Sequence, residues 1–187
     1  MMRAGLELDD LTLAAARKGD VRACERIYRT FRQPAYNLAA RVCGCRDLAE
    51  DITQDAFITA FRRIRQFRGD APFWGWLRRV VVNHAISALR KRPNQPDQPL
   101  EDHLAPVRGD QGRLGDAMDL EQALGCLGHE DRAVVWLHDV EGYRHAEIAQ
   151  LFGMTESFSK TRLSRARARL RDLMAADHES QVAGATG

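Results

Sequence analysis

Residues 67–92 read FRGDAPFWGWLRRVVVNHAISALRKR, and the organisation of the rest of the chain follows from this stretch. Its first residues include a glycine, an aspartate and Pro72, which together favour a turn. After Pro72, apolar residues recur at intervals of three and four, which predicts a helix with one buried face. Basic residues close this helix, and Pro93 ends it.

The polar side of the predicted helix carries Arg78, Arg79 and Asn83, and such a surface suits contact with a nucleic acid. A solvated amphipathic helix explains the same charges, because charged helix faces usually meet only water. Asn83 favours contact, since an amide near a buried stripe costs energy unless it is hydrogen-bonded, and it can read a base edge. By angle, Trp76 is expected in the core, whereas Trp74 lies near the edge of the stripe and could contact a base.

The composition is that of a globular protein. The 187 residues are 44% hydrophobic and 29% charged, which is enough for one large or two small domains. No apolar run approaches the roughly 20 residues of a membrane span, and the N-terminus lacks the pattern of a secretory signal, so we expect a cytoplasmic protein. The four cysteines form no zinc-binding pattern, and we expect neither a metal nor another cofactor.

Charge is distributed unevenly, although the formal net charge is only +2. Residues 62–92 include nine basic residues and one acid, and residues 160–171 include six basic residues and no acid. Acids gather instead over residues 47–55 and in the middle of the chain. Two separate basic stretches indicate two contacts with a polyanion.

Three helices are expected upstream, near residues 9–18, over 21–42 and over 48–67. Gly44 closes the second of them, and Pro34 is expected to kink it.

The third upstream helix carries Asp51, Gln54 and Asp55 at i, i+3 and i+4, on a face apart from its apolar stripe. Acids near a helix N-terminus are favourable by themselves, by a few tenths to ~1 kcal/mol each. Docking onto a basic partner explains the same residues, and position alone does not separate the two interpretations.

Downstream of the central helix, residues 93–116 contain four prolines, scattered acids and no sustained period, which predicts a flexible acidic linker. This linker would join an N-terminal domain, residues 1–92, to a second helical domain over residues 117–174. Residues 175–187 are small and polar, and we expect a disordered tail. The predicted fold is therefore all-α, with two small helical domains and a helix-turn-helix in the second.

Helices of the second domain are expected over residues 118–127, 130–140, 145–152 and 155–174. Ala149 and Gly153 suit the close contact and the turn of a helix-turn-helix, and Thr155 can cap the last helix.

The last helix has an apolar stripe and, opposite it, a ridge of small polar side chains between basic flanks. Small residues let a helix approach the bases in a major groove, and basic flanks meet the phosphates on either side. A basic surface helix without a ligand is the alternative. The preceding helix and turn favour DNA binding.

The two halves together resemble the bacterial sigma factors of the extracytoplasmic-function (ECF) group of the sigma-70 family. Residues 47–92, DLAEDITQDAFITAFRRIRQFRGDAPFWGWLRRVVVNHAISALRKR, are similar to the N-terminal conserved region of that family. Residues 129–171, HEDRAVVWLHDVEGYRHAEIAQLFGMTESFSKTRLSRARARLR, are similar to its C-terminal helix-turn-helix. The order of the regions and the linker between them also match.

The resemblance implies a promoter-specificity subunit of RNA polymerase and not an enzyme. Asp51, Gln54 and Asp55 would dock on the clamp helices of the largest polymerase subunit. The residues that would hold a flipped base and contact the melted minus-ten strand are Phe67, Arg68, Gly69, Asp70, Ala71, Trp74, Arg78, Arg79 and Asn83. The residues that would read the minus-thirty-five element are Ser157, Lys160, Thr161, Arg162, Ser164 and Arg165.

The resemblance also implies partners: the flap of the second-largest polymerase subunit, promoter DNA as duplex and as melted non-template strand, and an anti-sigma factor, with no small-molecule substrate. The linker would run towards the RNA exit channel of the polymerase. A stand-alone helix-turn-helix regulator with an N-terminal sensing domain is the alternative, and it leaves the acidic face without a role. An enzyme is the other alternative, but the sequence shows no Ser-His-Asp set, phosphate loop or metal cluster.

Two departures from the family pattern concern the second domain. Ser157, Phe158 and Ser159 stand where Gly-Thr-Val is frequent, so a serine replaces an apolar core residue, and Phe158 could fill the space. Leu127 and Gly128 stand where Leu-Pro is usual. Both changes bear on the tilt of the recognition helix and therefore on the promoter sequence.

Overall fold

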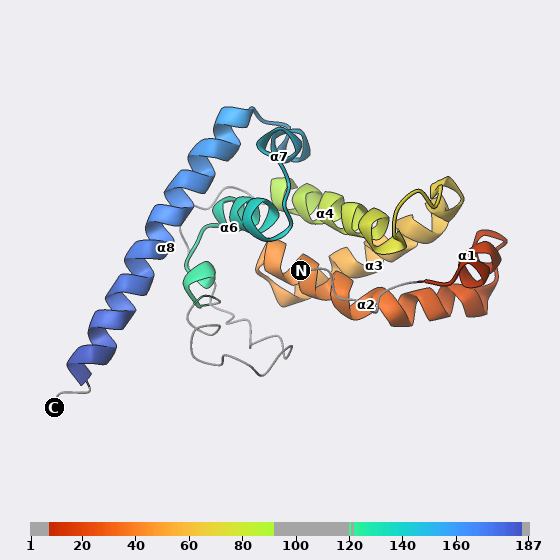
Figure 1. Ribbon diagram of the computed structural model, residues 1–187, viewed down its shortest axis with the longest axis horizontal. Coiled ribbons are helices and arrows are strands. Elements are labelled where there is room, and N and C mark those ends of the chain that lie inside the picture. The colour runs from red at the N-terminus through yellow and green to blue at the C-terminus, as the bar shows by residue number, and fades with distance from the viewer. Residues whose placement is uncertain (1–7, 92–119, 121, 185–187) are drawn as a thin grey trace. The chain divides into compact units, whose positions relative to one another are not determined.

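The computed structural model describes residues 8–91, 120 and 122–184, with side chains placed as far as residue 175 (Figure 1). Within these ranges every regular element is a helix, which confirms the predicted all-α fold. None of the described helices is long and apolar enough to cross a membrane. The expected linker, residues 93–116, lies outside the described residues.

Contacts between residues divide the chain into two compact units. The first unit comprises residues 1–40 and 46–88, and the second comprises residues 41–45 and 89–187.

The N-terminal part of the chain contains four α-helices and one 3-10 turn. They are α1 (Asp10–Arg17), α2 (Val21–Cys43), α3 (Arg46–Arg63), η1 (Ile64–Gln66) and α4 (Phe73–Lys91). The predicted helix over residues 48–67 is therefore shorter at its C-terminal end, because the chain tightens into η1 after Arg63. Helix α4 begins directly after Pro72, as the turn signal predicts.

The core of the first unit lies where α2, α3 and α4 pack against one another. Its largest fully buried side chains are Ile27, Phe31, Leu77, Val81, Val82 and Ile86. Burying each such side chain contributes about 1.5–3 kcal/mol relative to leaving it in water. Tyr28 of α2 packs edge-on against Phe57 of α3, with ring centroids 4.9 Å apart. The core therefore fixes the faces that these three helices present to solvent.

Local signals set the helix ends in this unit. Asp9 caps α1, since its Oδ1 accepts a hydrogen bond of 2.7 Å from the backbone N of Thr12. Hydrogen bonds from the hydroxyl and backbone N–H of Thr12 lower the pKa of the Asp9 carboxyl. Gly44 follows α2 with a φ of +69°, which confirms that it closes the helix. Pro34 lies inside α2, which continues to Cys43.

The second unit ends in a helix-turn-helix. Residues 120 and 122–125 are helical, and they precede α6 (His129–Val135), the π-helical turn η2 (Trp136–Val140), α7 (His145–Phe152) and α8 (Glu156–Gly184). The helix predicted over residues 130–140 is thus divided between α6 and η2. Helix α8 extends past its predicted end into residues expected to be disordered, where alanine and glutamate favour helix.

The turn between α7 and α8 forms as the sequence predicts. Gly153 adopts a left-handed φ of +67°, and the Oγ1 of Thr155 accepts a hydrogen bond of 3.3 Å from the backbone N of Phe158. Ile148 of α7 and Ala166 of α8 are fully buried. Helix α8 packs against both α7 and α6, and this packing positions its exposed side.

Arg132 on α6 is buried and joins that helix to the segment before it. Its Nε and Nη2 donate hydrogen bonds of 2.8 Å to the carbonyls of Leu124 and Gly125. These carbonyls lie at the end of a helical segment, where acceptors lack a full set of intrahelical donors, and the Leu124 carbonyl also accepts from the backbone N of Leu127 at 3.2 Å. Burial lowers the pKa of Arg132 to about 10, so the side chain stays charged at neutral pH.

Candidate nucleic-acid interface

Asp51, Gln54 and Asp55 are all exposed on one side of α3, whereas the adjacent Ile52 and Ala56 point into the core. We call these three residues the α3 acidic face. Their backbone is held by the packing of α2 and α4 on the other side of the helix. The face is therefore a preformed surface with a net negative charge.

Ile58 extends this face with an apolar side chain that the sequence analysis did not single out. It is 49% exposed and lies at i+7 from Asp51 and i+4 from Gln54, so it continues the same row along α3. The signal was available in the sequence, because Ile58 falls outside the apolar stripe of its helix. This isoleucine adds exposed apolar area to the α3 acidic face.

A cavity of about 280 Å³ lies beside the α3 acidic face, between α2 and α3. Its lining consists of Tyr28, Arg32, Gln33, Tyr36, Glu50, Thr53 and Gln54. Gln54 belongs to both features, so the surface continues from α3 onto α2.

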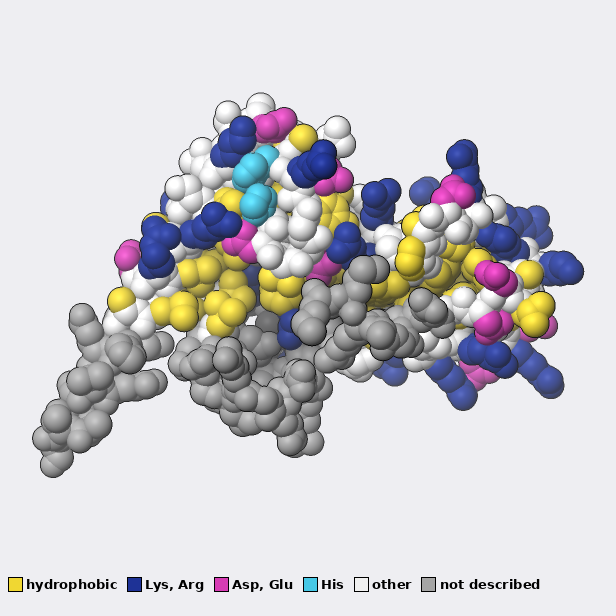
Figure 2. All heavy atoms as spheres, in the orientation of Figure 1, with side chains coloured by type: hydrophobic (Ala, Val, Ile, Leu, Met, Phe, Trp, Pro, Cys, Tyr) yellow, Lys and Arg dark blue, Asp and Glu magenta, His cyan; other side chains and the backbone are white. Residues whose placement is uncertain are grey.

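Residues 67–71, which we call the 67–71 loop, combine one buried and four exposed side chains. Phe67 is only 7% exposed, and its ring packs edge-on against Phe73 with centroids 5.4 Å apart. Gly69 has a φ of +91°, which favours glycine. The structure therefore places Phe67 as an anchor and leaves Arg68 to Ala71 open to solvent. Figure 2 shows Lys and Arg side chains gathered at this end of the first unit, near α1 and η1.

Asn83 and Arg79 are exposed on α4, and Arg78 is half-buried beside them; we call these three residues the α4 polar face. Asn83 thus points away from the valines that surround it in the sequence. Helix α4 is fixed to α3 in part by a hydrogen bond of 3.0 Å between the Thr59 hydroxyl and His84 Nε2. The α4 polar face therefore has a fixed position relative to the 67–71 loop.

The two tryptophans at the start of α4 are both half-buried. Trp76 packs against Phe67 with ring centroids 5.6 Å apart, on the core side as predicted. Trp74 lies parallel to the fully buried Phe31, at 6.0 Å and an interplanar angle of 3°. Trp74 is therefore a stacked ring at the edge of the core.

Ser157, Thr161 and Ser164 are exposed along α8, and Lys160 and Arg165 are exposed beside them. We call these five residues the α8 polar face. Lys160 lies 3.5 Å from Glu156, one turn away, and Arg165 lies 3.6 Å from Asp131 of α6. Both cations are well exposed, so these ion pairs are weak and open to exchange for phosphates.

Arg162, which we predicted to contact DNA, lies instead between α8 and α6. Its Nη1 donates a hydrogen bond of 3.0 Å to Asp131, and its Nη2 pairs with Glu130. Its side chain is 23% exposed, and its guanidinium lies 5.3 Å from the centre of the Phe158 ring. This arrangement could not be predicted from helical periodicity, because Asp131 and Glu130 lie 31 and 32 residues before Arg162, on a different helix.

Ser159 is fully buried, at the position where an apolar residue is frequent in the family that the sequence resembles. Its hydroxyl lies 3.0 Å from Nδ1 of His145, at the start of α7. The neighbouring Phe158 packs against Phe152, with ring centroids 5.6 Å apart. Between α7 and α8, Ser159 and His145 therefore form a polar pair, and the rings of Phe152 and Phe158 pack beside it.

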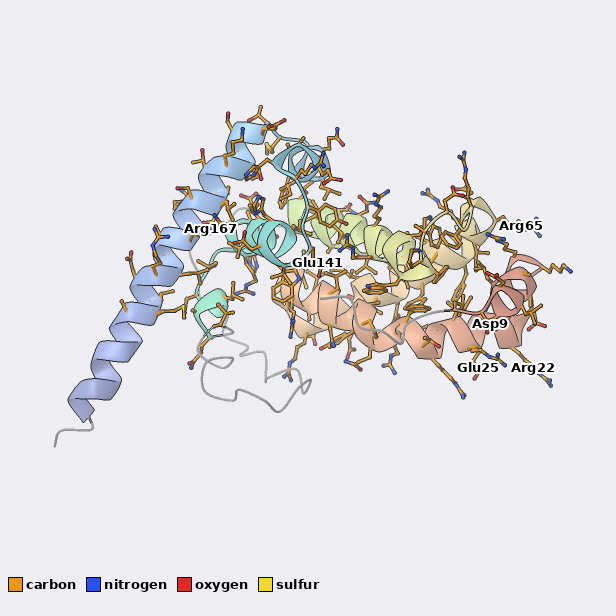
Figure 3. The ribbon with its side chains drawn as sticks, viewed as in Figure 1. Asp9, Arg22, Glu25, Arg65, Glu141 and Arg167 are labelled. Carbon is orange, nitrogen blue, oxygen red and sulfur yellow. The ribbon has the colours of Figure 1, made fainter. Side chains whose placement is uncertain are left out.

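His145 stacks on His138, with ring centroids 4.5 Å apart. Burial and the positive charges of His138 and Lys160 lower the pKa of His145. Nδ1 of His138 lies 2.8 Å from Asp139, and Asp139 in turn accepts hydrogen bonds from Arg167 of α8 (Figure 3). Burial alone would raise the pKa of Asp139, but the hydrogen bonds from Arg167 and His138 outweigh it and lower the pKa.

The described residues contain no cluster of three or more histidine, cysteine or carboxylate side chains that could hold a metal ion.

Comparison with known families matches both parts of the chain. Residues 27–94 match Sigma-70 region 2, and residues 117–170 match Sigma-70 region 4. A chain that carries these two regions in this order is of the sigma-70 class.

Similarity to named relatives shows to which group of the sigma-70 class this chain belongs. The ECF RNA polymerase sigma factor SigM of Mycobacterium tuberculosis is 36% identical over 162 residues, which are 87% of this chain and 82% of SigM. The ECF RNA polymerase sigma factor SigE of Mycolicibacterium smegmatis is 34% identical over 168 residues, which are 85% of this chain and 64% of SigE. The chain therefore belongs to the ECF group of RNA polymerase sigma factors. This membership makes it a promoter-specific transcription initiation factor and does not favour a stand-alone regulator.

A solved structure shows the same fold. The sigma factor RpoE of Bartonella quintana, in complex with the anti-sigma factor NepR, has a TM-score of 0.53 and 22% sequence identity, and the similarity covers 84% of this chain and 99% of that chain.

Proposed function

We propose that three surfaces divide the work of transcription initiation between them. The α3 acidic face binds core RNA polymerase, and the 67–71 loop with the α4 polar face captures the melted minus-ten strand. The α8 polar face reads the minus-thirty-five duplex. In this proposal residues 1–92 form the first domain, residues 117–174 the second, and residues 93–116 a linker that runs towards the RNA exit channel. The observation that carries the proposal is that each surface is exposed while its helix is fixed by a buried core.

The chemistry of the α3 acidic face suits a basic protein partner. Its two carboxylates and one amide are exposed, and Ile58 supplies an apolar contact within the same row. Electrostatic attraction between the carboxylates and a basic partner speeds the encounter of the two proteins, and Ile58 contributes binding energy once their surfaces are in contact. We propose that the clamp helices of the largest polymerase subunit bind here, and that the flap of the second-largest subunit binds the second domain.

The 67–71 loop and the α4 polar face suit a single strand. The exposed backbone of residues 68–71 can surround an unstacked base, and Asn83 can donate to and accept from a base edge. Trp74 is held against Phe31, so it can support an adjoining base at little entropic cost. Phe67 takes no part through its ring, because that ring is committed to the core.

The α8 polar face suits the major groove of a duplex. Ser157, Thr161 and Ser164 are short enough for the helix to approach base edges, and Lys160 and Arg165 are placed for phosphates or guanine. Arg162 is left out of this surface, since its ion pairs with Glu130 and Asp131 hold α8 on α6.

An anti-sigma factor is a further partner that the comparisons support, because the RpoE relative was solved in complex with one. For this chain, the expected result is that such a protein prevents binding to core polymerase. The measurement is competition between core enzyme and a candidate anti-sigma factor for the labelled full-length chain.

The test of the proposed function is transcription from a library of promoter fragments by core polymerase with and without this chain. RNA 5′ ends should appear only when the chain is present, and their promoters should share two motifs at a constant separation. Core polymerase that gains no start sites from the chain would contradict the proposal.

Substitutions in this chain test which surface binds core polymerase. Neutralising the α3 acidic face by Asp51→Asn, Gln54→Ala and Asp55→Asn should abolish core binding and leave the circular dichroism spectrum unchanged. The matched control removes two exposed acids elsewhere, by Asp10→Asn and Glu25→Gln, and should bind core enzyme like the wild type. Equal binding by both variants would remove the α3 acidic face from the proposal.

A further inference from the structure

Helix α1 lies outside the part of the chain that matches Sigma-70 region 2, yet it contacts the 67–71 loop directly. Two arginine side chains donate hydrogen bonds to backbone carbonyls at this contact. Nη2 of Arg17 donates to the backbone carbonyl of Phe67, and Nε of Arg65 donates to the backbone carbonyl of Arg17, at 3.1 Å. The side chain of Arg17 thus holds the loop, while the side chain of Arg65 holds the end of α1.

The contact satisfies backbone groups that lack partners of their own. The last carbonyls of a helix have no intrahelical donor, and the Arg17 carbonyl is at the end of α1. A guanidinium there also interacts favourably with the negative end of the helix dipole. Figure 3 shows Arg65 beside α1.

The loop is held at its two ends and open between them. At its start, the Phe67 backbone N donates to the Ile64 carbonyl at 3.3 Å, and the Phe67 carbonyl accepts from Arg17. At its end, Phe73 begins α4 and its ring packs on that of Phe67. The Arg17 guanidinium also lies 5.8 Å from the centre of the Phe67 ring. The two ends of the loop are therefore held in place, and only residues 68–71 between them can change conformation.

We propose that Arg17 is a positioning residue for base capture: it fixes the Phe67 carbonyl and so keeps residues 68–71 in the conformation that receives a flipped minus-ten base. Arg17 itself does not touch the DNA. This inference rests on the proposed function of the 67–71 loop. A carbonyl that loses its charged donor lets the start of the loop rotate, and small displacements of a binding group cost large factors in affinity.

The experiment uses holoenzyme formed from core polymerase and the full-length chain. The probe is a single-stranded oligonucleotide carrying the minus-ten element of a promoter found in the library screen, with 2-aminopurine at each position in turn. Unstacking of the captured base raises 2-aminopurine fluorescence, and titration gives the affinity. Arg17→Ala should weaken capture roughly tenfold, and Arg17→Lys, which keeps a charged donor, should restore most of it.

The matched control is Arg22→Ala, which removes another arginine from the same end of the unit (Figure 3). It is exposed at the start of α2 and should behave like the wild type. The dependence of affinity on salt concentration distinguishes a positioning role of Arg17 from a direct contact between Arg17 and a phosphate. A phosphate contact predicts that Arg17→Ala lowers the slope of log affinity against log salt by about one, whereas positioning predicts an unchanged slope.

Core binding and the thermal midpoint of each variant complete the test. The proposal requires that Arg17→Ala binds core enzyme like the wild type, and that Arg65→Ala weakens capture in the same direction. It is overturned if Arg17→Ala captures the base as well as Arg22→Ala, if the salt slope falls by about one, or if core binding is lost in proportion to capture. If the wild-type holoenzyme shows no fluorescence change at any position, the loop assignment itself fails, and this inference fails with it.

Discussion

Four basic residues of α8 lie against neighbouring acids, whereas Arg68 of the 67–71 loop and Arg79 of α4 are left open to solvent. On α8, Lys160, Arg165 and Arg167 each lie within 4 Å of a carboxylate, and Arg162 is held by two. In the first unit, Arg68 and Arg79 form no ion pair with any residue that the structure describes.

This difference fits the two kinds of nucleic acid that the proposed function assigns. A duplex has a fixed groove, and α8, which would read it, is held on α6 by the partly buried ion pairs of Arg162 with Glu130 and Asp131. A melted strand has no fixed shape, and exposed cations can follow its phosphates. Basic residues can therefore anchor a helix in one unit and attract a nucleic acid in the other.

Arg162→Ala should give the largest effect on stability. Removing this guanidinium leaves the carboxylate of Asp131, which is only 12% exposed, without its closest partner. We expect the second unit to lose about 2 kcal/mol of unfolding free energy. Urea titration, with hydrogen exchange in α6 and α8 as the readout, measures it. Arg169→Ala, an exposed arginine of the same helix, is the control, and equal losses for both variants would show that α8 is not anchored by Arg162.

Arg165→Ala should separate binding from stability on the same helix. Its side chain is 62% exposed, so the unfolding free energy should hardly change. Affinity for a minus-thirty-five duplex should fall roughly tenfold, because a phosphate or guanine contact is lost. Fluorescence anisotropy of a labelled duplex with holoenzyme checks this. If the Arg165→Ala variant unfolds more easily but binds the duplex with unchanged affinity, Arg165 stabilises the fold and does not contact the DNA.

Asn83→Ala should weaken capture of the melted minus-ten strand and leave duplex binding intact. The expected loss is about fivefold to tenfold, since one pair of hydrogen bonds to a base edge disappears. Asn37→Ala, which removes an amide from α2, serves as the control in the same oligonucleotide titration. Equal affinity of the two variants for the single strand would remove Asn83 from the α4 polar face.

Acid should weaken the second unit slightly more than the first. The pKa of His145 is held below its ordinary value of 6.5 by burial and by the nearby positive charges of His138 and Lys160. Between the lowered pKa and 6.5 the unfolded chain therefore binds more protons than the folded chain, so stability is full above about pH 6.5 and falls as the pH drops below it. The thermal midpoint of the second unit, measured from about pH 7.5 to about pH 5.5, checks this direction.

His145→Gln keeps a side chain that can hydrogen-bond Ser159 but cannot titrate. The variant should have a flatter pH profile, although His138, Asp139, Glu156 and Arg167 around the site are unchanged. A wild-type slope in the variant would assign the pH dependence to another group.

Features set by neighbouring residues could be predicted from the sequence. The start of α4 after Pro72, the closing turn at Gly44 and the left-handed Gly153 all depend on local backbone preferences. The exposure of the α3 acidic face also followed from helical periodicity. These predictions needed no knowledge of which elements pack together.

Features set by tertiary contacts could not be predicted in this way. The run of cations from residue 160 to residue 171 contains no acid, so it gave no sign that Glu130 and Asp131 would hold Arg162. The hydrogen bonds from Arg65 to the Arg17 carbonyl and from Arg17 to the Phe67 carbonyl likewise join residues far apart in the chain. Periodicity describes one helix at a time, and these contacts belong to two.

The pair formed by the buried Ser159 and the half-buried His145 limits how freely recognition helices can be exchanged between relatives. A chimera that received α8 from a protein with an aliphatic residue at position 159 would place a methyl group against Nδ1 of His145 and remove the hydrogen-bond partner of that nitrogen. Residues 145 and 159 therefore have to be transplanted together. Engineered promoter specificity in this protein would depend on a residue that never reaches the DNA.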